Sequence, residues 1–103
     1  MAAEPPDGVW QGGSTGTFGA GCYIRTTARF AVREHEATGE DVIPEGSAMP
    51  AGRFAIRGMV AGDGGFAGSV GAWPLKGRFS GDSFEGDYEF GGCTMIMRLR
   101  RAG

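Results

Sequence analysis

Apolar and polar residues alternate with a period of two along much of the chain, as they do in strands with one buried face. Residues 22–34 show the alternation most clearly, with Tyr23, Arg25, Arg29 and Arg33 on the outward face. The inward face carries Cys22, Ile24, Thr26, Ala28, Phe30 and Val32. Further short strands are predicted over residues 53–60, 66–72, 75–80, 84–90 and 93–101. No segment has the spacing of a capped amphipathic helix longer than about two turns, so the pattern predicts an all-β chain.

Glycine-rich turns separate these strands. Residues 62–65, 80–83 and 91–92 tolerate the positive φ angles that tight hairpins need. Residues 56–70 match residues 75–88 as an internal repeat, with a glycine in the middle of each inward face. Alternation of large and small inward residues suits a narrow barrel. We therefore predict a small antiparallel up-and-down β-barrel, or a strongly coiled sandwich, of seven to eight short strands.

Residues 35–52 break the alternation and are predicted to form a long acidic loop. They are polar and contain Pro44 and Pro50, and their candidate binding residues are Glu40, Asp41 and Met49. Their spacing does not follow the alternating oxygen ligands of a calcium loop, so no metal site is predicted. Loops of this length in compact domains are usually functional or mobile.

Cys22 and Cys93 are the two cysteines, and they form either a disulfide or two buried thiols. Both fall on inward faces, which favours the disulfide and would make the strands at 22–34 and 93–101 neighbours. A disulfide persists in an oxidising compartment. Residues 1–7 have the composition of a flexible stub left after signal-peptide removal, ahead of a single domain at 8–103; an ordinary cytosolic N-terminus is the alternative. The expected localisation is periplasmic or secreted.

Composition narrows the function classes. With 103 residues, 21 glycines and 41% hydrophobic residues, the chain is expected to form one folded domain. Ten Lys+Arg against twelve Asp+Glu give a net charge of -2, so we expect no nucleic-acid partner. There is no apolar run long enough for a transmembrane helix. His35 is the only histidine, so the sequence predicts no catalytic site, no cofactor and no enzyme activity.

A resemblance to known proteins rests on three features: the hairpins with a Phe-x-Gly-x-Tyr motif, an early Gly-Val-Trp at residues 8–10, and a closing Gly-Gly-Cys-Thr at 91–94 whose strand ends in basic residues. In these features the chain resembles small, glycine-rich exported bacterial proteins of uncharacterised function, mostly from alphaproteobacteria. The similarity spans residues 8–100. It implies export and a β-barrel, and it carries no catalytic residues.

Outward arginines are the main candidate surface-binding residues. Arg25, Arg29, Arg33, Arg53 and Arg57 lie on two predicted strands with no acidic strand beside them, and Tyr23 shares this face. They would form a basic stripe for a protein or an anionic envelope component. The alternative is that the acidic 35–52 loop folds back over them and neutralises them.

These features predict a non-enzymatic exported binding protein of the bacterial envelope that acts through the arginine strands and the 35–52 loop. One alternative is a periplasmic inhibitor of a protease or lysozyme that presents that loop. A second is a carrier that holds a small apolar ligand inside the barrel, although a filled interior is favoured. The sequence leaves the oligomeric state and the partner open.

Overall fold

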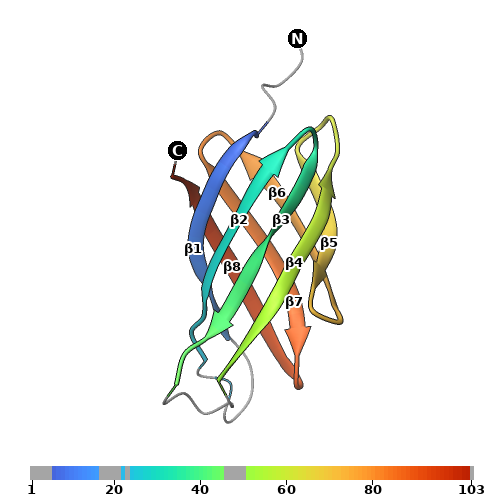
Figure 1. Ribbon diagram of the computed structural model, residues 1–103. Coiled ribbons are helices and arrows are strands. Elements are labelled where there is room, and N and C mark those ends of the chain that lie inside the picture. Colours follow the sequence, from blue (N-terminus) through green and yellow to red (C-terminus); the bar gives the residue numbers. More distant parts are fainter. Residues whose placement is uncertain (1–5, 17–21, 23, 46–50, 103) are drawn as a thin grey trace.

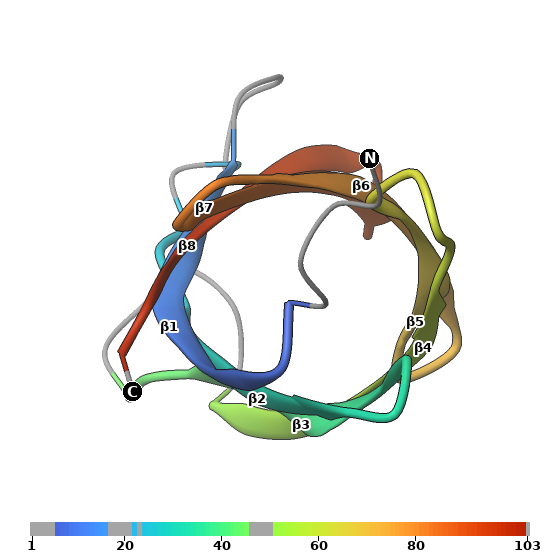
Figure 2. The same cartoon turned by 90° about the horizontal axis from the view of Figure 1, so that it is seen from above.

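The protein is an eight-stranded antiparallel barrel, seen in a computed structural model that describes residues 6–16, 22, 24–45 and 51–102. Each strand pairs with the next along the chain, and β8 pairs with β1 to close the ring (Figures 1 and 2). This confirms the predicted all-β up-and-down barrel. The strands are β1 (Gly8–Gly16), β2 (Thr27–Arg33), β3 (Glu36–Ile43), β4 (Gly52–Val60), β5 (Gly65–Val70), β6 (Trp73–Ser80), β7 (Ser83–Phe90) and β8 (Cys93–Arg101).

The barrel has two ends with different connections. The upper end in Figure 1 carries the turns β2–β3, β4–β5 and β6–β7, and the lower end carries the connections β1–β2, β3–β4, β5–β6 and β7–β8. The predicted glycine turns are confirmed, since Gly64, Gly81, Gly91 and Gly92 all have positive φ between 58° and 90°. A side chain at these positions would be strained, which explains why glycine punctuates the hairpins.

Aromatic rings fill the upper half of the interior. Trp10, Phe30, Phe66, Phe79 and Phe84 come from five different strands and are all at least nine-tenths buried. Neighbouring ring centroids lie 4.8–6.3 Å apart, mostly edge to face. Such pairs add roughly 0.5–1.5 kcal/mol each beyond the area they bury. This half of the barrel is a packed core.

Inward glycines make room for these rings. A Cβ at Gly58 would lie 2.2 Å from Cζ of Phe66, and a Cβ at Gly77 would lie 2.6 Å from Cζ of Phe84. The two glycines occupy equivalent places in the two repeated hairpins. Because large and small inward residues alternate along the repeat, each of these two rings packs against the backbone of a glycine.

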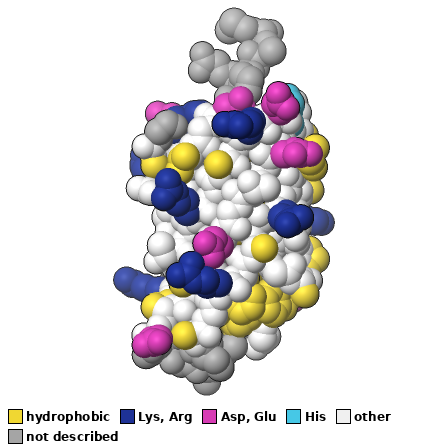
Figure 3. All heavy atoms as spheres, in the orientation of Figure 1, with side chains coloured by type: hydrophobic (Ala, Val, Ile, Leu, Met, Phe, Trp, Pro, Cys, Tyr) yellow, Lys and Arg dark blue, Asp and Glu magenta, His cyan; other side chains and the backbone are white. Residues whose placement is uncertain are grey.

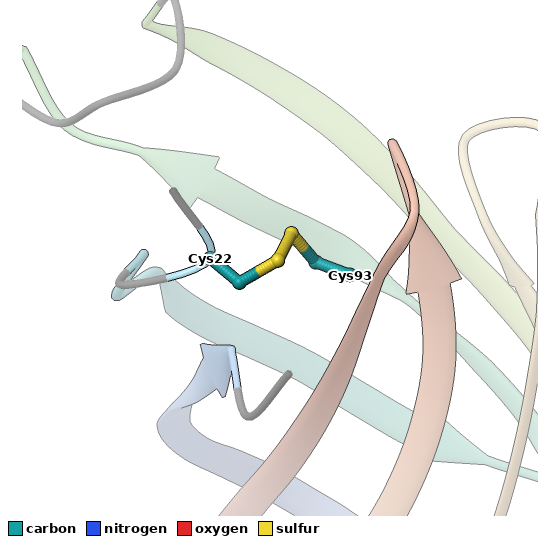
Figure 4. The surroundings of a disulfide bond; sticks show 2 residues. All are labelled: Cys22 and Cys93. Atoms are coloured by element: carbon teal, nitrogen blue, oxygen red, sulfur yellow. A yellow bond between two sulfur atoms is a disulfide. The ribbon is translucent and has the colours of Figure 1, made fainter. Parts of the chain in front are cut away.

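Cys22 and Cys93 form a disulfide at the lower end, with their Cα atoms 5.5 Å apart (Figure 4). The predicted bond is confirmed, but the predicted pairing of strands is wrong. Strand β1 lies between β2 and β8, so β1 closes the barrel. Residues 24–26 lie outside β2 and follow β1 instead, through a single bridge between Thr15 and Arg25.

The predicted loop at 35–52 is wrong over residues 36–43. Residues Glu36–Ile43 form β3, which pairs with β4 along its whole length and with β2 over residues 36–42. A two-residue turn precedes it, in which Glu34 and His35 have φ of 52° and 68°. Asp41 is buried on the inward face of β3, and Glu40 is exposed on its outward face. Only the connection between β3 and β4 remains, and Met49 lies outside the described residues.

The N-terminal segment reaches the upper mouth of the barrel (Figure 2). Pro6 is buried, and the indole Nε1 of Trp10 donates a hydrogen bond of 2.8 Å to its carbonyl. Residues 6 and 7 therefore belong to the folded barrel and not to a flexible stub. Residues 1–5 of the expected stub lie outside the described residues.

Candidate functional site

Outward charges are sorted by strand around the barrel. The outward charged residues of β2, β4, β6 and β8 are basic, those of β3 and β7 are acidic, and β1 and β5 present none. The strand predicted at 84–90 is acidic on its outward face and lies between two basic strands, with Glu85 opposite both Arg78 and Arg98. The wall therefore consists of two groups of three strands, basic–acidic–basic, separated by the uncharged strands β1 and β5.

Strand β3 corrects the prediction that no acidic strand lies beside the arginine strands. Its Glu40 is directly opposite Arg29 of β2, but its carboxylate bonds Arg53 of β4 at 3.2 Å. Both side chains of that pair are largely exposed, so it contributes little to stability. The sequence predicted that acidic residues of a loop could neutralise the arginines. In the structure the acidic residue is Glu40 of the paired strand β3, and the arginine that it neutralises is Arg53.

Arginines without an ionic partner surround β1. Gln11 of β1 lies opposite Arg29 of β2 on one side and Arg100 of β8 on the other. Neighbouring strands are about 4.8 Å apart, so these two arginines leave the backbone roughly 10 Å from each other. Neither has a carboxylate within 4.0 Å in the described part of the chain.

Two further arginines extend this surface along β1. Arg98 lies opposite Gly13, and Arg25 is bridged to Thr15. Arg98 is in contact with Glu85 at 3.3 Å, and both groups are more than six-tenths exposed. We call this surface the arginine face: Arg25, Arg29, Arg98 and Arg100 around Gln11, Gly13 and Thr15. Figure 3 shows basic side chains on the part of the wall that includes β1 and β2.

The other predicted surface residues are dispersed. Arg33 lies near the upper end opposite Glu36, and Arg57 lies on β4 between Thr38 and Ser69. Tyr23 is outside the described residues. His35 is exposed in the β2–β3 turn and lies apart from the arginine face. The sequence therefore located Arg25 and Arg29 correctly, but it did not identify Arg98 and Arg100 as their neighbours.

The lower half of the interior contains polar side chains. Ser14, Thr26 and Asp41 are buried, and the hydroxyl of the buried Tyr88 donates a hydrogen bond to Oδ2 of Asp41. Thr26 Oγ1 accepts a hydrogen bond of 3.0 Å from the Ser14 amide. We call Ser14, Thr26, Asp41 and Tyr88 the polar cluster. No local pattern in the sequence indicates this cluster, because its members come from four separate parts of the chain.

Burial controls the protonation of this cluster. Desolvation raises the pKa of Asp41, and interactions with Thr26, Tyr88 and the Val42 backbone offset part of the rise. Desolvation and the negative charge of Asp41 raise the pKa of Tyr88 well above its usual range, so its hydroxyl stays protonated and acts as a donor. Two atoms of the cluster, Asp41 Oδ1 and Ser14 Oγ, have no hydrogen-bond partner.

The barrel wall opens beside this cluster. Strands β6 and β7 pair only from Lys76–Asp87 upward, and Pro74, which lies below that point, has no amide hydrogen to donate. A hollow of about 520 Å³ lies here, which we call the side hollow. Its lining residues are Trp73, Pro74, Lys76, Asp87, Tyr88, Glu89 and Thr94. The centroid of the Trp73 ring lies 5.2 Å from that of Phe54 and 4.4 Å from that of Phe90.

In the described ranges, no three His, Cys, Asp or Glu side chains are grouped closely enough to hold a metal ion. The part of the chain that the structure describes also has no helix that could span a membrane. Comparison of the chain with protein-family models, curated proteins and solved structures gives no match.

Proposed function

We propose that this protein is a non-enzymatic binding protein that takes an anionic partner on the arginine face. The observation that carries the proposal is the position of Arg29 and Arg100 on either side of Gln11, with no carboxylate within 4.0 Å of either guanidinium in the described chain. Four guanidinium groups, of which only that of Arg98 pairs with a carboxylate, create a local positive potential on a chain with a net charge of -2.

Guanidinium chemistry favours sulfate, phosphate or carboxylate groups as the partner's contacts. An arginine binds such anions through two parallel N–H donors, which adds geometric specificity to charge attraction. The outward residues of β1 beside the arginines, Gln11, Gly13 and Thr15, carry no charge, so this strand adds no carboxylate that would compete with the partner's anionic groups. A partner with several anionic groups would bridge β2 and β8 across β1.

Export to the envelope is part of the same proposal. The disulfide between Cys22 and Cys93 supports it, because such bonds are stable in oxidising compartments. The packed aromatic core argues against the carrier alternative in the upper half of the barrel. Enzyme activity is not favoured: Ser14 Oγ has no hydrogen-bonded base to activate it, as a nucleophile would need.

Binding to immobilised heparin tests the proposal with a defined polyanion. We expect the wild-type protein to be retained at low salt and released as salt screens the arginines. The double variant Arg29→Glu/Arg100→Glu should pass through unretained. The matched control is Arg57→Glu/Lys76→Glu, which changes the net charge equally on strands outside the arginine face and should stay bound. No retention of the wild type, or equal loss in both variants, would contradict the proposal.

A further inference from the structure

Two buried polar atoms in the polar cluster lack partners. Asp41 and Ser14 are each 1% exposed, yet Asp41 Oδ1 and Ser14 Oγ make no hydrogen bond. A buried polar atom without a partner costs about 1–3 kcal/mol, and more if it is charged. The two side chains belong to one cluster around Tyr88, whose hydroxyl bonds the other carboxylate oxygen of Asp41. Each of the two atoms can therefore accept a further hydrogen bond.

The chemistry of these atoms selects the missing group. A carboxylate oxygen only accepts hydrogen bonds, and a serine hydroxyl has two acceptor positions. A primary ammonium group carries a positive charge and three N–H donors, so it can satisfy both atoms at once. A divalent cation fits less well, because calcium and magnesium need six or more oxygen ligands and the cluster has one carboxylate.

The side hollow adjoins the polar cluster at Tyr88. Tyr88 lines the hollow, and its hydroxyl donates a hydrogen bond to Asp41, so one residue belongs to both. Trp73 lines the same hollow, and aromatic rings attract cations and cover alkyl chains. Asp87 and Glu89 at its rim outnumber Lys76, which leaves a local charge that favours a cation.

We propose that the lower half of the barrel binds a primary amine. The ammonium group lies between Asp41 Oδ1 and Ser14 Oγ, and its alkyl chain lies against Trp73 in the side hollow. A free alkylamine and a lysine side chain of another protein share this chemistry. The site is independent of the arginine face, because the two take ligands of opposite charge on different parts of the barrel.

Titration calorimetry with two probes tests the site. n-Pentylamine represents a free amine, and a lysine capped at its α-amino and carboxyl groups represents a protein side chain; n-pentanol is the uncharged control. We expect saturable binding of at least one amine and none of pentanol. Binding of the capped lysine alone would identify a protein side chain as the ligand. Binding of pentylamine alone would identify a free amine.

Variants locate the binding. Asp41→Asn keeps the shape of the side chain and should weaken amine binding at least about tenfold, as loss of a charged hydrogen bond does. Ser14→Ala should weaken it several-fold, and it remains informative if Asp41→Asn does not fold. Glu36→Gln, at an exposed position of the same strand β3 and outside the side hollow, is the matched control and should change affinity less than twofold. No amine binding by the wild type, or unchanged affinity in Ser14→Ala and a folded Asp41→Asn, would overturn the proposal and assign the pair to an ordered water.

Discussion

Tyr88 on β7 donates a hydrogen bond to Asp41 on β3 across the full width of the barrel, because the two strands are four apart in a ring of eight. This contact ties opposite walls together at the level where β6 and β7 stop pairing. It also places a carboxylate away from water, where ionisation is unfavourable.

The stability of the protein should therefore depend on the protonation of Asp41. Its pKa is raised above the ordinary value of 3.8, so the folded protein favours the protonated form. The contribution of Asp41 to the free energy of unfolding is therefore fully present below the pKa that Asp41 has in the unfolded chain. It is lost as the pH rises through the higher pKa that Asp41 has in the folded protein. Each unit of the rise corresponds to about 1.4 kcal/mol.

Chemical denaturation of the wild type and of Asp41→Asn over this pH range checks the prediction. The free energy of unfolding of the wild type should fall relative to that of the variant as the pH rises from about 4. The difference between the free energies of unfolding of the wild type and of Asp41→Asn removes the contribution of the other carboxylates, which both proteins share. A constant difference between the two proteins would mean that Asp41 titrates as an exposed carboxyl.

Alanine at the inward glycines should destabilise the barrel. Phe66 and Phe84 cannot move away from a new Cβ at Gly58 or Gly77, because their rings pack against Phe30. We expect Gly58→Ala and Gly77→Ala each to cost about 1–3 kcal/mol, as overpacking does. Thermal or chemical denaturation measures the loss.

Gly62→Ala is the matched control for these variants. A Cβ at Gly62 meets nothing within 4 Å, and its φ is not positive. This variant should be as stable as the wild type or slightly more so. If all three variants lose the same amount, the cost comes from backbone conformation and not from the rings.

Reduction of the disulfide should weaken the lower end. A loop that spans 71 residues contributes about 4 kcal/mol in the chain-entropy model. We therefore expect a large drop in the free energy of unfolding for the Cys22→Ser/Cys93→Ser variant. Intact mass before and after reduction should differ by two hydrogens, and two alkylatable thiols in the untreated protein would contradict the bond.

The sequence predicted the barrel but missed one strand for a physical reason. The inward positions of β3 are Ala37, Gly39, Asp41 and Ile43, so only the last is a large apolar residue. Phe30 of β2 occupies the space over Gly39, where a Cβ would lie 2.6 Å from that of Phe30. The turn before β3 also has positive φ at Glu34 and His35, where glycine or asparagine is the usual signal.

The candidate sites could be predicted only in part, because they are formed by β3 and by the pairing of β1 with β8 that closes the barrel. Alternation alone placed Arg25 and Arg29 on the surface, but only the pairing of β1 with β8 brings Arg98 and Arg100 beside them. Local patterns do not encode such contacts between distant strands. The polar cluster was missed for the same reason, because a buried Asp41 resembles a loop residue in the sequence.

The most direct measurement of the central claim is an NMR titration of ¹⁵N-labelled protein with a short heparin oligosaccharide. The account predicts that amide shifts concentrate on Gln11, Gly13 and Thr15 of β1 and on their neighbours Arg29 and Arg100, and that they vanish at high salt. Shifts that concentrate on β4 and β6 instead, or no shifts at low salt, would contradict it.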